Sequence, residues 1–230
     1  MSTIDPSILA KRPNYIKEEK IESDVTEGTT FAYCSLIQSN SQVLQKKSKK
    51  YIKDAQAGDY VIQVKDGESA LFKGDQGFTF IPLAHRKRYV GFADMSEGGK
   101  WIGNFKTLEE AERKRSSPKD RFNLSIDFLV VVEHYEDNPV VISFNSPKKV
   151  IVARELLKHF SDLQTVSGFK YRLRSEDSFV EKINGYVQSY IVEPVNWVSE
   201  EERKMLEGFP EASISYFSGE EAKETTLVVM

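Results

Sequence analysis

The chain has 230 residues, of which 40% are hydrophobic and 29% are charged, and its net charge is −3. This length and composition are those of an ordinary globular protein with one large domain or two small ones. A single cysteine and three histidines exclude an internal disulfide and a Cys/His zinc cluster, and we expect neither a metal nor another cofactor.

Two further classes of protein are excluded by the sequence. No apolar stretch reaches the roughly 20 residues that cross a bilayer, so we expect a cytoplasmic protein without a membrane span. The motifs GxGxxG, GxSxG, HExxH and GxxxxGK followed by Ser or Thr, which mark nucleotide-binding and hydrolytic sites, do not occur. The sequence therefore favours binding over catalysis, and we expect a protein that is not an enzyme.

Charge is distributed unevenly along the chain. Residues 1–27 carry four basic and six acidic side chains (−2), residues 28–174 carry 24 and 17 (+7), and residues 175–230 carry four and 12 (−8). Charge runs are often only solvated faces, but these basic runs recur beside aromatic residues, in QKKSKKYIK, HRKRY and FKYRLR. Lysine and arginine neutralise phosphates while flat rings stack on bases, so the interleaving favours single-stranded nucleic acid over a duplex.

Predicted elements alternate between short strands and turns in the first half of the chain. Composition and periodicity predict a flexible arm, strands, a short helix in the lysine-rich stretch before residue 57, and a helix opened by the capping box TLEE. Pro82 and Gly91 predict a bulge or an edge position near each, because proline cannot donate to a ladder and glycine packs poorly. The flexible arm is expected at 1–27. The strands are expected at 29–37, 59–65, 78–92 and 101–105, and the helix with the capping box at 107–115.

The second half of the chain contains the most apolar segment, 123–135, which predicts a central core strand. We expect a turn at 136–139, a strand at 140–144, and a helix that starts after Ser146 and runs to about His159. Two strands and a helix with the capping box SEEE complete the body. These last elements are expected at 169–174, 186–192 and 199–208.

These elements predict a mainly β protein, an OB-like barrel of five to seven antiparallel strands with two or three short helices. The expected domains are a flexible N-terminal arm (1–27), a single OB-like nucleic-acid-binding domain (28–208) and an acidic C-terminal tail (209–230).

Strand alternation assigns faces to the basic runs. Lys170, Arg172 and Arg174 share one face of a strand above a buried Tyr171 and Leu173. If no bulge intervenes in 78–92, the basic residues 86 and 88 share a face with the phenylalanines at 78, 80 and 92. The candidate nucleic-acid-binding residues are Lys46, Lys47, Lys49, Lys50, Tyr51, Lys53, Arg86, Lys87, Arg88, Tyr89, Phe92, Trp101, Lys148, Lys149, Lys170, Arg172 and Arg174.

Each candidate also has a plainer interpretation. A tryptophan is more often a core anchor than a stacking platform, so we assign Trp101, after a Gly-Gly turn, to the ligand and Trp197 to packing. Asp127 and Glu133 lie six residues apart on one strand face, as in a metal-dependent nuclease, but the lysine expected two residues after the glutamate is Tyr135. A nuclease is therefore the third alternative, after an adaptor whose basic face binds an acidic protein partner.

The order of these segments resembles a diverse group of bacteriophage single-stranded DNA-binding proteins, over residues 30–208. The similarity rests on GDYVIQV, FTFIPL followed by RKRYVGF, the SPKK helix, YRLRS, YVQSYIV and the terminal WVSEEE helix. It implies an OB-like barrel that coats single-stranded DNA, with RNA as the alternative ligand, during phage replication or recombination. The resemblance also implies contacts between an acidic tail and replication or recombination proteins, although Lys223 and the apolar LVVM end depart from that pattern.

Overall fold

The computed structural model describes residues 31–63, 69–94, 96, 99–180 and 185–209, together with Lys11 and Pro13. Most of the predicted N-terminal arm and the C-terminal tail after Phe209 lie outside the described residues. The described elements are β1 (Ala32–Leu36), η1 (Gln42–Leu44), β2 (Tyr60–Gln63), β3 (Ser69–Phe72), β4 (Phe78–Phe92), β5 (Trp101–Phe105), α2 (Leu108–Arg113), β6 (Arg121–Val132), β7 (Tyr135–Phe144), α3 (Pro147–Leu163), β8 (Phe169–Val180), β9 (Gly185–Trp197) and α4 (Glu200–Leu206).

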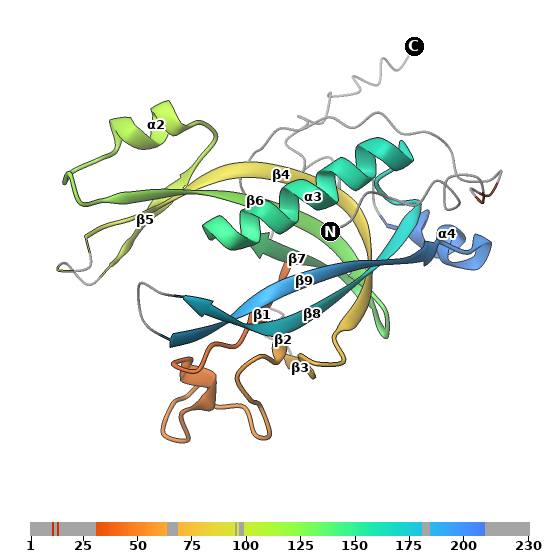
Figure 1. Cartoon of the computed structure of the whole chain (residues 1–230), viewed down its shortest axis with the longest axis horizontal. Helices are drawn as coiled ribbons and strands as arrows, with labels where there is room; N and C mark the ends of the chain where they lie inside the picture. Colours follow the sequence, from red (N-terminus) through yellow and green to blue (C-terminus); the bar gives the residue numbers. More distant parts are fainter. Residues whose placement is uncertain are drawn as a thin grey trace, which may run out of the picture.

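The strands form one strongly curled sheet, a half-barrel, and the prediction of a mainly β protein is confirmed (Figure 1). Their order is β3-β2-β1-β7-β6-β4-β8-β9, with β5 paired to β4 outside this path. The predicted five to seven strands are too few, because the sheet of the described residues has nine strands, among them the short β3, which was not expected. The described pairs are antiparallel except β1 with β7, which is parallel.

Helix α3 fills the concave side of the half-barrel (Figure 1). Its residues Ala153, Leu156 and Phe160 are fully buried against the central strand β6, whose residues 125–132 are all buried. A curled sheet must cover its concave apolar face, and here a helix does so where a closed barrel would use its opposite wall. The predicted core strand and the helix after Ser146 are confirmed, and α3 runs four residues past the expected end at His159.

Strand β4 carries both irregularities that Pro82 and Gly91 predict. Its register shifts between Pro82 and Ala84 against β6, and between Gly91 and Phe92 against β5. The first bulge exchanges the two faces of the strand: Phe80 lies in the main core, whereas Ala84 lies in a separate apolar cluster. The expected shared face of the phenylalanines at 78 and 80 with the arginines at 86 and 88 is therefore wrong.

The hairpin between β6 and β7 turns earlier than predicted. Val132 pairs with Tyr135, so the turn consists of Glu133 and His134 and not of residues 136–139. His134 has φ 65°, the left-handed conformation that tight two-residue hairpin loops need. The expected turn residues 136–139 instead extend β7 at its start.

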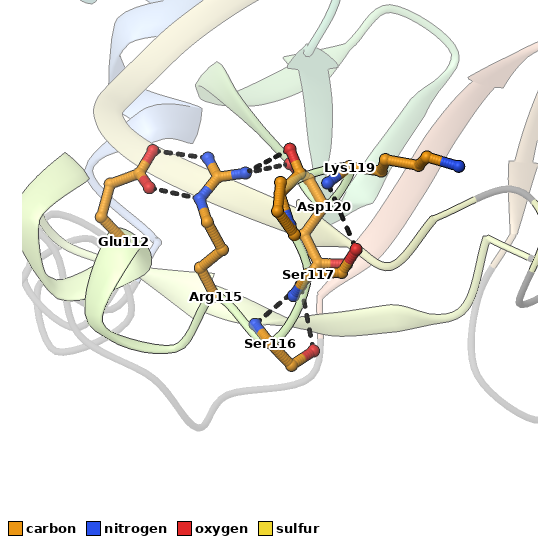
Figure 2. A network of polar contacts seen from close by, with 7 residues as sticks. Glu112, Arg115, Ser116, Ser117, Lys119 and Asp120 are labelled. Carbon is orange, nitrogen blue, oxygen red and sulfur yellow. Dashed lines mark hydrogen bonds and ion pairs between the residues drawn. The ribbon is translucent and has the colours of Figure 1, made fainter.

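The far ends of β4, β5 and β6 project beyond the rest of the sheet, with α2 beside them (Figure 1), and we call this projection the arm. A local polar network fixes the chain between α2 and β6 (Figure 2). The Asp120 carboxylate accepts hydrogen bonds from the backbone of Ser116 and Ser117, both at 2.9 Å, and these bonds lower its pKa. Arg115 donates to the Glu112 carboxylate and to the Asp120 carbonyl, 2.6 Å away. The end of α2 therefore has a defined position next to the start of β6.

Side chains link the two ends of the half-barrel where no strand pairing does so among the described residues. The Gln38 amide donates to the carbonyl of Gln188 on β9 and accepts from its backbone N–H, both at 3.0 Å. The Ser175 hydroxyl of β8 donates to the Gly58 carbonyl at 2.7 Å. One residue on each of β8 and β9 thus contacts the loops next to β1 and β2.

Candidate nucleic-acid interface

The structure distributes the predicted binding residues over four separate places. The lysines at 46, 47, 49, 50 and 53 are exposed, together with Tyr51, on the loop between η1 and β2. This lysine loop (residues 45–53, orange) lies at one end of the molecule, away from the arm (Figure 1). The other predicted residues lie on β4 and the arm, at the start of α3, and on β8.

Arg86 and Arg88 do not lie on the solvent face that their sequence context suggests. Their Nε atoms lie 3.1 and 2.7 Å from the Asp127 Oδ2, and the Asp127 carboxylate is fully buried on β6. The Arg88 contact is close without being aligned as a hydrogen bond, while the Ser125 hydroxyl donates to Asp127 Oδ1 at 2.7 Å. These two arginines compensate a buried carboxylate, so they are not unpaired surface charges that a phosphate backbone could contact directly.

The basic stripe of β8 has the predicted faces, since Tyr171 and Leu173 are fully buried. Two of its three cations, however, are already paired. Lys170 Nζ lies 2.7 Å from Glu202 Oε1 of α4, and Arg174 forms an ion pair with Glu193 of β9 that lowers the pKa of the glutamate. Carboxylates inside the chain therefore neutralise much of this stripe.

The two lysines at the start of α3 contact the β8–β9 hairpin. Lys148 Nζ donates to the Ser178 hydroxyl at 2.6 Å and to the Phe179 carbonyl at 3.2 Å. Lys149 Nζ lies 4.2 Å from the centroid of the Tyr190 ring, and burial lowers its pKa. Lys148 is exposed, whereas Lys149 is half-buried, so only Lys148 presents its charge fully to solvent.

Lys87 and Tyr89, two further predicted residues, line a cleft of about 600 Å³ between the arm and α3, which we call the arm cleft. Two further cations of this cleft, Lys106 before α2 and Arg154 on α3, are not among the residues predicted from the sequence. The apolar side chains that line it are Leu108, Leu124, Ile126 and Leu157, with Thr107 beside them. Among the described residues, no carboxylate lines this cleft and none forms an ion pair with its three cations.

His85, two residues from Lys87, adds no charge beneath this cleft at neutral pH. Its ring is buried next to Phe128 and Phe160, with centroids 6.2 and 6.3 Å away. Burial, and then the charge of Lys87, lower the pKa of His85 to about 4. The positive charge of the arm cleft is therefore that of its lysine and arginine side chains.

The two tryptophans have the environments that the sequence predicts. Trp101 is 61% exposed at the start of β5, where it pairs with Phe92, and the register shift between Gly91 and Phe92 places this pair on the face of the arm opposite to Tyr89 and Phe105. Trp197 contacts Phe169, with ring centroids 5.2 Å apart, and packs against the main core. Phe92 is half-buried.

A second cleft, of about 670 Å³, has mixed charge. Its lining includes Arg172 and Arg174, but also three carboxylates, those of Asp75, Glu133 and Glu193. It is therefore less suited to a phosphate backbone than the arm cleft.

The pair of acids that suggested a nuclease is not brought together. Asp127 is buried between two arginines, whereas Glu133 is exposed in the β6–β7 turn. Among the described residues, no three His, Cys, Asp or Glu side chains gather where they could hold a metal ion.

Within the described part of the chain, no helix combines the length and the apolar character of a membrane span.

Comparison with known proteins identifies a family. Neither the curated proteins nor the solved structures contain a match to this chain. The model of one family, described as Pam3 phage gp34-like protein, matches residues 29–212, which is most of the chain. The chain therefore belongs to the Pam3 phage gp34-like family of bacteriophage proteins.

Proposed function

We propose that this phage protein binds single-stranded DNA without sequence preference, and that the arm cleft is the centre of the binding surface. The observation that carries the proposal is the lining of this cleft, to which Lys87, Lys106 and Arg154 contribute together with the Tyr89 ring, and to which no described carboxylate contributes. Cations beside a ring suit a ligand that presents phosphates and unpaired bases together.

The contrast with the other basic runs supports this assignment. Arg86, Arg88, Lys170 and Arg174 are paired with carboxylates of the chain, so contact with a phosphate would have to replace an existing ion pair. The three cations of the arm cleft have no such competitor among the described residues. Their charge is available to release counterions from DNA.

The exposed side of α3 extends the positive surface beyond the cleft. Lys148, Arg154 and Lys158 are exposed on this helix; Arg154 and Lys158, four residues apart, lie on one side, and Lys148 lies at the start of the helix. Stacking on rings such as Tyr89 and Trp101 accepts any base, which is why the proposed binding is independent of sequence. The OB-like character of the sheet, the role in replication or recombination in the host cytoplasm, and tail contacts with other proteins belong to the same proposal and rest on the resemblance of the sequence to phage single-strand binders.

Titration of the full chain with fluorescent oligo(dT) tests the proposal, with a duplex of equal length as the comparison and magnesium present in a parallel series. We expect binding to oligo(dT), weaker binding to the duplex, and no cleavage. Absence of oligo(dT) binding would favour the alternative of an acidic protein partner, and cleavage products with magnesium would favour a nuclease.

A further inference from the structure

Two aromatic rings that the sequence analysis did not select are exposed together near the end of the β8–β9 hairpin. Phe179 and Tyr186 are direct cross-strand partners, with ring centroids 5.4 Å apart in an edge-to-face arrangement. Phe179 is 47% exposed and Tyr186 is 67% exposed, the highest value among the large apolar side chains of the described residues. Exposed paired rings of this size are unusual unless something covers or uses them.

These rings lie on the face of the sheet that the core occupies. Alternation along β8 places Phe179 on the face of the buried Tyr171 and Leu173, and alternation along β9 places Tyr186 on the face of the buried Tyr190. Helix α3 covers this face at Tyr190, where Lys149 lies over the ring, but α3 begins only at Pro147. The two exposed rings therefore lie on the same concave face, beyond the first turn of α3, where the helix no longer covers the sheet.

A cation is held beside the pair. Lys148 Nζ donates to the Phe179 carbonyl and to the neighbouring Ser178 hydroxyl, which fixes the start of α3 against the hairpin. Lys148 forms no ion pair with a described residue. Asp177, the carboxylate nearest along this face of β8, accepts a hydrogen bond from the Gln188 side chain at 2.5 Å.

We propose that Phe179 and Tyr186 form a base-stacking site for single-stranded DNA, with Lys148 at the adjacent phosphate. This inference rests on the proposed function and extends it, because α3 lies between the arm on one side and the β8–β9 hairpin on the other (Figure 1). A strand that occupies the arm cleft and follows the exposed cations of α3 reaches the hairpin at Lys148. At this site further bases of the bound strand stack on the two rings, on the side of α3 opposite to Tyr89.

The first test compares the double variant Phe179→Ala/Tyr186→Ala with the full-length wild type in binding to oligo(dT). We expect a loss of affinity of roughly 5- to 100-fold for each stacked base, with an unchanged salt dependence because the rings carry no charge. Val195→Ala, which removes an exposed apolar side chain elsewhere on β9, is the matched control and should bind like the wild type. Equal affinity of the double variant and the wild type would overturn the inference and leave the proposed function intact.

A second test detects the stacking itself. In Tyr186→Trp, with the fluorescence change of the wild type subtracted to remove the signals of Trp101 and Trp197, the new indole should be quenched by oligo(dT) but not by an abasic oligodeoxynucleotide of the same length, which has phosphates and no bases. Quenching that is equal for both ligands, or absent for both, would contradict a stacking site. If the wild type binds neither ligand, the proposed function fails and the hairpin site fails with it.

Discussion

Arg88 and Asp127 form an ion pair inside the sheet, with Arg88 Nε 2.7 Å from a carboxylate that has no exposure to solvent. Arg86, which lies directly opposite Asp127 in the β4–β6 register, contacts the same oxygen at 3.1 Å. A buried carboxylate without compensating cations destabilises the folded protein. We therefore assign this cluster a role in the stability of the fold and not in ligand binding.

The double variant Arg86→Ala/Arg88→Ala should therefore unfold more easily, with a loss of about 3 to 5 kcal/mol in the free energy of unfolding, because Asp127 is left as an uncompensated buried charge. Urea denaturation measures this loss. Lys87→Ala, between the two on the same strand but exposed, should change stability by less than about 0.5 kcal/mol. Equal stability of the two variants would show that the buried cluster is unimportant.

The two tryptophans should separate binding from folding. Trp101→Ala should weaken oligo(dT) binding by about 1 to 3 kcal/mol while leaving the melting temperature nearly unchanged, because the ring is exposed. Trp197→Ala should lower stability by about 3 kcal/mol, because the ring packs on Phe169 and the core. Thermal unfolding and fluorescence anisotropy, measured on both variants, test these two expectations. If Trp101→Ala lowered stability and Trp197→Ala weakened binding, the stacking surface would not lie on the arm.

Gln38→Ala should destabilise the half-barrel by about 1 to 2 kcal/mol, since it removes both hydrogen bonds to the backbone of Gln188 and leaves that edge of β9 unpaired. Gln45→Ala on the exposed lysine loop is the matched control and should have little effect. Hydrogen exchange of the Gln188 amide gives a local measurement. Unchanged protection in Gln38→Ala would mean that this contact does not hold the two ends of the sheet together.

Acid should destabilise the protein through His85. Its pKa is lowered to about 4 in the folded protein, against about 6.5 when unfolded, so the unfolded chain binds the proton more readily between these values. Stability from this group is complete above about pH 6.5 and is lost as the pH falls toward 4, a change on the order of 3 kcal/mol. His85→Leu should remove this part of the pH dependence of unfolding, whereas His134→Asn, at the exposed hairpin turn, should retain it.

Local chemistry in the sequence predicts much of the fold. The capping box at Ser199, the proline after Ser146 and the bulge-forming Pro82 each act within a few residues, and the structure contains α4, α3 and the β4 bulge where they are expected. Long-range relations were not predictable in this way. The β4 bulge reverses the faces of the arginines at 86 and 88, whose partner Asp127 lies on another strand.

The arm cleft shows the same limit. Lys87 and Tyr89 stand out in the sequence because they lie in one basic run, whereas Lys106 and Arg154 come from two other elements and lie in no such run. Only the folding of the arm against α3 brings the four residues together. The exposed positions of α3, read at helical spacing, offered the one signal that could have found Arg154.

The salt dependence of oligo(dT) binding by Lys87→Ala/Lys106→Ala/Arg154→Ala tests the arm cleft most directly. Each phosphate contact contributes about 0.7 to the slope of log affinity against log salt for single strands, so loss of three cations should flatten the slope by about 2. A matched triple variant on the lysine loop, Lys46→Ala/Lys47→Ala/Lys49→Ala, makes the same change of net charge at another place. We predict a flattened slope for the cleft variant and a nearly unchanged slope for the loop variant; the opposite result, or equal slopes for both, would contradict single-strand binding in the arm cleft.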